Sequence, residues 1–172
     1  MTSPFHLRPA VASDLDAILA LERATDLAPH WPLSAYSDVL DLNLGGPFTP
    51  RSLRNGWETT PHRCLFIAES TDQLVGFAVG LLHPAAPTRV AELESVVVSA
   101  NFRRTGVGRS LCLAILDWSR SQHATELILE VRANSTAAIA LYTSLGFNLT
   151  ARRPSYYRDP IDDALLLHRA LL

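Results

Sequence analysis

An apolar stretch that runs directly into a turn with two glycines most constrains what this chain can fold into. Residues 96–98 are all valine, residues 103–108 form the turn, and a helical pattern begins within it. The first amides of a helix have no partner inside the helix and lie at the positive end of its dipole. They can therefore hold a phosphate where no Cβ blocks the approach, as at Gly106 and Gly108. The sequence predicts an anion site at a strand-to-helix junction, with three arginines supplying charge: Arg103, Arg104 and Arg109.

The turn matches neither of the common nucleotide-binding patterns. A Walker loop needs GxxxxGK[ST], which the chain does not contain, and a dinucleotide fingerprint needs a third glycine where Leu111 stands. The predicted anion is therefore not assigned to a nucleoside triphosphate or a dinucleotide.

Composition indicates one globular domain over residues 1–172. An apolar fraction of 48% over 172 residues is enough for a substantial core. A net charge of -2 argues against a protein whose main role is direct nucleic-acid binding.

Cysteine and histidine usage indicates neither a disulfide nor a metal site. Cys64 and Cys112 lie among apolar neighbours and are expected to be reduced and buried, and the six histidines form no ligand pair. The N-terminus has no leader pattern, and no apolar run approaches the ~20 residues of a membrane span. We expect a soluble cytoplasmic protein that does not bind a membrane.

The first half of the chain predicts a short strand, two helices and a hairpin. The strand covers residues 5–8, and Ser13 with Asp16 resembles the capping box of a helix that continues to about Ala24. A second helix is expected to begin at a Ser34 cap, and residues 44–62 are expected to form a long loop. Two strands over residues 64–69 and 74–82 follow, with a bulge or a close backbone approach at Gly76 and Gly80.

The second half predicts strands alternating with helices. Strands are expected over residues 90–98 and 126–132, a helix over 136–145 that ends at Gly146, and last strands over 148–152 and 164–171 around a turn at 154–160. The uniformly apolar residues 96–98 predict burial on both faces of their strand. The fold class is α/β of the α+β type, with a mixed, mostly antiparallel sheet and helices on both faces.

Two motifs together resemble the Gcn5-related N-acetyltransferase (GNAT) family. They are the RxxGxG turn and the stretch from Leu129 to Phe147, which contains Leu-Glu-Val-Arg and Leu-Tyr-x-x-x-Gly-Phe. Within that family the chain is most similar to RimI-type ribosomal protein alanine N-acetyltransferases. The resemblance covers residues 90–171 closely and the first half of the chain more loosely.

The resemblance implies a GNAT fold in which two parallel strands splay apart and acetyl-coenzyme A enters between them. The co-substrate would pair with free backbone groups of Val96, Val97 and Val98. Its pyrophosphate would lie on the turn and helix start formed by Arg103, Arg104, Thr105, Gly106, Val107, Gly108 and Arg109. No metal is implied.

The resemblance also implies a catalytic pair, Glu130 as the general base and Tyr142 as the general acid. An N-terminal amine has a pKa near ~7.7 to 8.0, so a base is needed to remove its proton before attack on the thioester. From the residues alone, Glu130 is more simply a partner of a nearby cation, and Tyr142 is more simply a core aromatic. Glu92 competes with Glu130, because some other relatives place their base at its position.

One contact with the coenzyme is ambiguous in this sequence. The family usually has an asparagine seven residues before the tyrosine, but here Ser135 stands at that position and Asn134 precedes it. Either side chain could supply the hydrogen bond.

The resemblance suggests a protein N-terminus as the acceptor, most specifically the N-terminal alanine of a small-subunit ribosomal protein. Tyr156 and Tyr157, in the last hairpin loop, would form one wall of a peptide cleft, and Trp31 and Tyr36 the other. Two alternatives stay open: acetylation of a small amine such as an amino sugar, polyamine or amino acid, and a non-catalytic coenzyme A-binding module.

Overall fold

The strands of the computed structural model, which describes residues 4–43, 62–83 and 88–171, form one mixed seven-stranded sheet. The strand order is β1-β2-β3-β4-β5-β7-β6, in which β4 and β5 are parallel and every other neighbouring pair is antiparallel. The strands are β1 (His6–Pro9), β2 (His62–Ser70), β3 (Gln73–His83), β4 (Val90–Val98), β5 (Glu126–Arg132), β6 (Asn148–Arg158) and β7 (Ile161–Ala170). The helices are α1 (Leu15–Arg23), α2 (Leu33–Asn43), α3 (Val107–Ser121) and α4 (Thr136–Ser144), with 3₁₀ turns η1 (Ala12–Asp14) and η2 (Ala100–Phe102).

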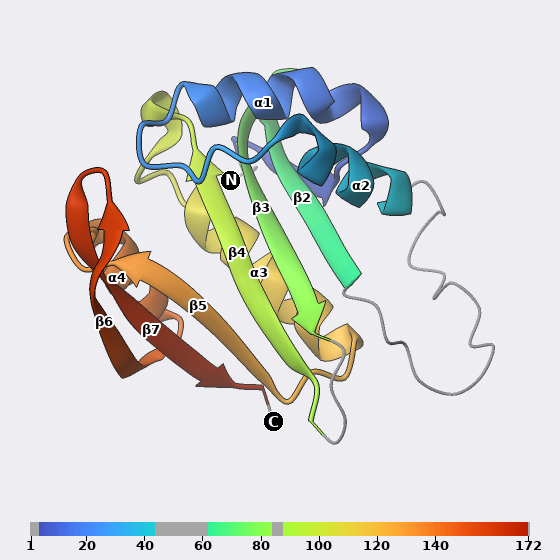
Figure 1. The fold of residues 1–172 in the computed structure, drawn as a ribbon. Coiled ribbons are helices and arrows are strands. Elements are labelled where there is room, and N and C mark those ends of the chain that lie inside the picture. Colours follow the sequence, from blue (N-terminus) through green and yellow to red (C-terminus); the bar gives the residue numbers. More distant parts are fainter. Residues whose placement is uncertain (1–3, 44–61, 84–87, 172) are drawn as a thin grey trace.

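Helices cover both faces of the sheet, as the sequence predicts. Figure 1 shows α1 and α2 across one face and α3 and α4 behind the other. Each face has its own buried cluster: Ile18 and Tyr36 pack on Phe77 beneath α1 and α2, whereas Leu111 and Ile115 pack beneath α3. Both cysteines are buried and free, as expected.

The close approach predicted at the two β3 glycines is confirmed. A Cβ on Gly76 would lie 2.9 Å from the Val97 carbonyl oxygen, and a Cβ on Gly80 would lie 3.0 Å from the Cys64 sulfur. The Trp118 ring of α3 is 3.1 Å from the same position at Gly80. The absence of side chains here lets α3 lie directly on the sheet, which fixes where its first turn stands.

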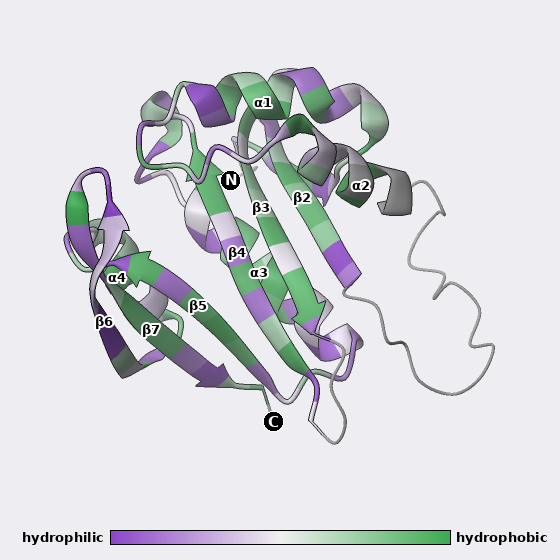
Figure 2. Cartoon of the chain, viewed as in Figure 1, coloured by the Kyte–Doolittle hydropathy of each residue, from purple (hydrophilic) through white to green (hydrophobic). Residues whose placement is uncertain are grey.

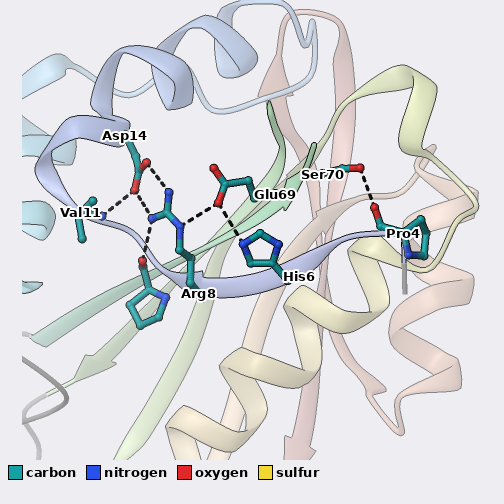
Figure 3. A network of polar contacts seen from close by, with 8 residues as sticks. Pro4, His6, Arg8, Val11, Asp14, Glu69 and Ser70 are labelled. Carbon is teal, nitrogen blue, oxygen red and sulfur yellow. Dashed lines mark hydrogen bonds and ion pairs between the residues drawn. The ribbon is translucent and has the colours of Figure 1, made fainter. Parts of the chain in front are cut away.

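Arg8 joins β1 to the start of α1 and to β2 (Figure 3). Its guanidinium donates to both carboxylate oxygens of Asp14 at 2.7 and 2.9 Å and to Glu69 at 3.0 Å. Asp14 also accepts the Val11 amide at 2.8 Å, so it is the capping carboxylate, not the predicted pair of Ser13 with Asp16. The hydrogen bond from Arg8 holds the pKa of the Asp14 carboxyl below its usual range.

Two further predictions need adjustment. The second helix begins at Leu33, so Ser34 lies in its first turn and is not its cap. The predicted loop at residues 44–62 lies outside the described residues except for His62, which begins β2.

The predicted turn over residues 154–160 is wrong, because both strands of the last hairpin extend toward a tip at Asp159 and Pro160. Pairing is interrupted between Arg153 and Tyr157 and then resumes as Tyr157 opposite Asp162. Within the interruption the Ser155 amide donates to Asp163 at 2.7 Å, and Arg152 donates to the same carboxylate at 2.6 Å. The Pro154 signal therefore marks an irregularity inside a strand.

Candidate active site

The parallel strands β4 and β5 are paired over only the first part of their length and then separate. Their ladder covers three pairs, ending with Glu92 opposite Ile128. Beyond that point β4 stays paired with β3 as far as Val98, and β5 stays paired with β7 as far as Arg132. The edge of β4 at Val96–Val98 that faces β5 therefore has no strand partner, and Figure 1 shows the two strands diverging.

A bulge in β4 lies at the point where the strands separate. Val79 of β3 faces Ser95 and Gly80 faces Leu93, so Glu94 is an extra residue. After it the alternation of side chains inverts: Leu93 packs in the α3 cluster, and Val97 packs in the α1 and α2 cluster. Bulges beside functional sites commonly redirect a side chain in this way.

The burial predicted on both faces of residues 96–98 is wrong in part. Val97 is buried, but Val96 and Val98 are half-buried. The face of this segment toward α3 is therefore less buried than the three valines predict. The sequence shows that these residues are apolar, but it does not show how closely other elements cover them.

The glycine turn begins α3 as predicted. Gly106 has φ +96°, in the left-handed region that favours glycine, and the position of its absent Cβ faces open space. Gly108 is less constrained, because a Cβ there would make ordinary contacts of 3.6 Å with Leu141 and Val98. The unpaired first amides of the helix thus lie at an open surface.

The other residues of the turn surround these amides. Arg103, Arg104 and Thr105 are exposed, and the Thr105 hydroxyl donates to the Phe102 carbonyl at 2.6 Å. Arg109 is exposed and donates to the Ser144 hydroxyl at 3.1 Å. Val107 is fully buried as a whole residue, so the prediction that it contacts the ligand does not fit this structure.

Glu130 lies on β5 beyond the last β4–β5 pair and forms an ion pair with Arg153 of β6. The sequence-based alternative of a cation partner is therefore present, although the partner is Arg153 and not Arg132. Arg153 stands opposite Ala164, which in turn stands opposite Arg132 on β5. Paired residues of antiparallel strands share a face, and Glu130 shares the face of Arg132 because it lies two residues before it on β5. Arg153 therefore reaches Glu130 across the small Ala164 side chain.

Tyr142 lies in α4 with 9% of its surface exposed, in the core cluster beneath α3 and α4. Its ring packs edge-to-face on Phe147 at 5.9 Å between centroids. Burial raises the pKa of the phenol well above its ordinary value, so the hydroxyl keeps its proton at neutral pH. The residue is a core aromatic and also a protonated donor.

Asn134 and Ser135 connect β5 to α4. The backbone N–H of Asn134 donates to the Asp162 carboxylate at 3.2 Å, and Ser135 is the residue before the helix. Asn134 is exposed and Ser135 is half-buried. Neither side chain is enclosed, so the structure leaves both available to a ligand.

Glu92, the competing carboxylate, lies at the closed end of the strand pair. It is paired with the His83 ring at 2.8 Å, and its neighbour across the ladder is Ile128. The β4 carboxylate at the opening is instead Glu94, which sequence reasoning missed. Glu94 accepts two hydrogen bonds from Arg63, at 2.7 and 2.9 Å.

A pocket of about 400 Å³ lies beside Glu94, lined by Trp31, Pro32, Ser34, Ala35, Arg63 and Glu94. Trp31, for which the sequence predicts contact with an acceptor, is one of the lining residues, and the Arg63 guanidinium lies 6.0 Å from its ring centre. Tyr36 is fully buried behind Trp31, so the prediction that it contacts an acceptor does not fit this structure. We call Trp31 and Pro32 the tryptophan wall.

Tyr156 and Tyr157 lie on β6 near the hairpin tip, and we call them the tyrosine wall. Their rings pack edge-to-face at 5.2 Å, and Tyr156 is 49% exposed. The Arg132 guanidinium lies 4.1 Å from the Tyr157 ring centre, and Arg153 lies 5.5 Å from that of Tyr156. Partial burial, followed by the charge of Glu130, raises the pKa of Tyr157.

Sequence reasoning missed Glu94, Arg63 and Arg153 because each depends on which strands lie side by side. For two of them, Glu94 and Arg153, the sequence contains a feature that points to their position. Gly80 indicated a bulge, which would have drawn attention to the carboxylate opposite it, and Arg153 directly precedes the hairpin irregularity at Pro154.

Within residues 4–43, 62–83 and 88–171, no cluster of three histidine, cysteine or acidic side chains could hold a metal ion. Among the same residues, no helix has the length and apolar character needed to cross a bilayer.

Comparison with known proteins places this arrangement among acetyltransferases. Residues 29–147 match the Acetyltransferase (GNAT) family. The N-alpha-acetyltransferase RimI of Mycobacterium tuberculosis is 34% identical over 128 residues, which cover 74% of this chain and 79% of that protein. An uncharacterized protein of Mycobacterium leprae is 30% identical over 167 residues, which cover 96% of this chain and 41% of that protein.

The ribosomal protein bS18-alanine N-acetyltransferase of Escherichia coli is 40% identical over 79 residues, covering 45% of this chain and 53% of that protein. The crystal structure of the Escherichia coli ribosomal-protein-S18-alanine N-acetyltransferase matches with a TM-score of 0.72 and 25% identity, covering 97% of this chain and 94% of that one. In sequence, the chain spans about half or less of the length of the first curated relatives that it matches.

Proposed function

Because the chain belongs to the GNAT family of acetyltransferases, we propose that it transfers an acetyl group from acetyl-coenzyme A to the N-terminal α-amine of a protein. The observation that carries this proposal is the separation of β4 and β5, which places a free strand edge, a helix start and Glu130 around one opening. The relative from Mycobacterium tuberculosis is named an N-alpha-acetyltransferase and that from Escherichia coli a ribosomal protein bS18-alanine N-acetyltransferase, which supports this acceptor class.

The residues at the opening fit acetyl-coenzyme A. Val96 and Val98 direct their backbone groups to the edge without a strand partner, which suits an extended amide-containing arm, whereas those of Val97 face Phe77 of β3. The amides of Gly108 and Arg109, in the first turn of α3, suit the pyrophosphate, and Gly106 leaves their approach open. Arg103, Arg104 and Thr105 border this anion site, and Asn134 or Ser135 supplies a further hydrogen bond.

Glu130 is the proposed general base. The acceptor amine arrives partly protonated at neutral pH and must lose a proton before it can attack the thioester. Its ammonium form carries the same charge as the Arg153 guanidinium, so it can replace that guanidinium beside Glu130. The proton then passes to the carboxylate, either directly or through a water.

Tyr142 is the proposed general acid. Attack on the thioester develops negative charge on oxygen, for which a backbone amide on the free edge of β4, such as that of Val98, is the proposed donor. Collapse of this intermediate expels the coenzyme A thiolate. A phenol whose pKa is raised by burial still carries the proton that the thiolate needs.

The acceptor peptide would lie between the tryptophan wall and the tyrosine wall. We propose a small-subunit ribosomal protein with an N-terminal alanine as the acceptor, following the name of the Escherichia coli relative. With that acceptor the reaction belongs to the cytoplasm, where ribosomal proteins are made. Acetylation of a small amine is the second candidate, because the carboxylate of Glu94 lines the pocket.

Thiol release with a panel of acceptors tests the proposal. The panel contains peptides beginning Ala-Arg, Met-Leu and Ser-Glu, together with spermidine and an aminoglycoside. We expect turnover with peptides, and a decrease on the order of 10²-fold or more in Glu130→Gln, the range for loss of a general base. Glu92→Gln is the matched control and should retain activity.

Three outcomes would contradict the proposal. Turnover of small amines alone would exclude the protein acceptor, and full activity in Glu130→Gln with loss in Glu92→Gln would move the base. Thermal stabilisation by acetyl-coenzyme A without thiol release from any acceptor would indicate a binding module.

A further inference from the structure

Glu22 is a buried carboxylate that the proposed chemistry does not use. It lies near the end of α1 and is 1% exposed, although most glutamates on a helix that packs on a sheet face water. A buried carboxylate must find hydrogen-bond donors to offset the loss of water. The donors that Glu22 finds show what it holds in place.

Among the described residues, two donors to Glu22 come from the segment that follows α1. The Tyr36 hydroxyl donates to Glu22 Oε1 at 2.5 Å, and the Trp31 amide donates to the same oxygen at 3.1 Å. One carboxylate oxygen thus fastens the backbone of the connecting loop and the first turn of α2 to α1. The bond from Tyr36 is enclosed, because Tyr36 is fully buried and its ring packs edge-to-face on Phe77 of β3.

These contacts continue to the pocket. The Trp31 ring lies 5.4 Å from the Tyr36 ring on its inner side and 6.0 Å from the Arg63 guanidinium on its outer side. Arg63 pairs with Glu94, the bulge residue of β4. The position of the Trp31 backbone therefore decides where the tryptophan wall stands relative to Glu94.

We propose that Glu22 is a positioning residue for acceptor binding, which acts by holding the Trp31 backbone and the Tyr36 hydroxyl so that the tryptophan wall keeps its place beside the pocket. This inference rests on the proposed function only in that the pocket receives the acceptor. Glu22 itself lies behind the wall and touches neither substrate.

The test compares Glu22→Gln with Glu22→Ala. The glutamine carbonyl oxygen can accept both hydrogen bonds, whereas alanine can accept neither. We expect Glu22→Ala to raise the KM for the best acceptor of the panel by about 10-fold or more, because the Trp31 backbone and the Tyr36 hydroxyl then both lose their hydrogen bond to α1. The KM for acetyl-coenzyme A should stay within about two-fold, and Glu22→Gln should recover most of the loss.

Tyr36→Phe provides a second variant if Glu22→Ala does not fold. It removes one of the two donors and keeps the ring on Phe77, and it should raise the acceptor KM by a smaller factor. An unchanged acceptor KM in the folded variants, or an equal rise for both substrates, would overturn the inference.

Hydrogen exchange of the Trp31 amide gives a readout that does not need turnover. This amide should exchange faster in Glu22→Ala than in the wild-type protein, while the amides of β4 keep their rates. If no amine of the panel were acetylated, the proposed function would fail. The exchange rate would still decide whether Glu22 holds the wall, and an unaltered rate would refute that step.

Discussion

The two walls beside the opening are built in opposite ways. The tryptophan wall stands on a buried carboxylate, a fully buried tyrosine and the hydrophobic cluster beneath α1 and α2. The tyrosine wall stands on an edge hairpin, where one arginine lies against the exposed ring of Tyr156 and another against the half-buried ring of Tyr157. The support of the first wall belongs to the core and that of the second to the surface, so the same kind of substitution should have global effects in one support and local effects in the other. Figure 2 shows the polar residues of the hairpin beside the apolar strands that α1 and α2 cover.

Removing Tyr36, which supports the tryptophan wall, and Tyr157, which belongs to the tyrosine wall, should give the largest difference. Tyr36→Ala deletes a fully buried aromatic side chain and should lower the free energy of unfolding by about 3–5 kcal/mol. Tyr157→Ala deletes a half-buried ring and should cost about 1 kcal/mol, the usual scale for a partly exposed site. Urea unfolding followed by circular dichroism measures both. Equal losses would show that the hairpin belongs to the cooperative core.

The pH dependence of stability should distinguish the same two tyrosines. Burial, followed by the bond to Glu22, raises the pKa of Tyr36 above its ordinary value of 10.0, so the folded state binds this proton more tightly than the unfolded chain. The contribution is complete below about pH 10 and is lost as pH rises above it, by up to about 1.4 kcal/mol per pH unit. Tyr36→Phe should reduce the slope between pH 10 and 11, and Tyr157→Phe should reduce it less. A larger effect at Tyr157 would contradict the assignment.

Loosening the hairpin tip should cause a local opening. Arg132 donates to the carbonyl oxygens of Asp159 and Pro160, both at 2.9 Å, and lies over Tyr157. Arg132→Ala should cost about 1 kcal/mol, because these bonds are exposed to competing water. Amide exchange should accelerate in residues 153–163 and stay unchanged in β3. Arg158→Ala, at the same tip, is the control, and acceleration in β3 would refute the local character.

The smallest effect should come from the ion pair at Glu130. Exposed pairs contribute about 0.2–1 kcal/mol, and salt screens them, so Arg153→Gln should barely change stability at high ionic strength. At low salt it should lower the acceptor KM by a few-fold, because no guanidinium then competes for Glu130. Arg152→Gln is the matched control, since Arg152 pairs with Asp163 instead. The same decrease in both variants would exclude competition at Glu130.

The strands and helices near the opening could be predicted because local signals agree with the tertiary fold there. The bounds of β4 and β5 match the expected ones, and Gly146 ends the helix after β5 with φ +83°. The mixed sheet followed from the order of strands and helices, and the resemblance to the GNAT family followed from two motifs. Both are confirmed.

What could not be predicted depends on pairing between distant residues. Glu130 is 23 residues from Arg153, and Glu94 is 31 residues from Arg63. No periodicity links such partners, because strand order decides which charges meet. Tyr36 shows the reverse problem: its aromatic character suggested a binding surface, but a hydroxyl with a buried acceptor can lie in the core.

The separation of β4 and β5 also bears on how the protein avoids self-association. An unpaired strand edge invites pairing with another chain, and the outer strand β6 carries charges and a proline that oppose it, at Arg152, Arg153 and Pro154. The free edge of β4 carries three valines instead, and it faces β5 inside the same sheet. Because the unpaired edge of β4 lies between two strands of the same molecule, it can stay accessible to a substrate without pairing with a strand of another molecule.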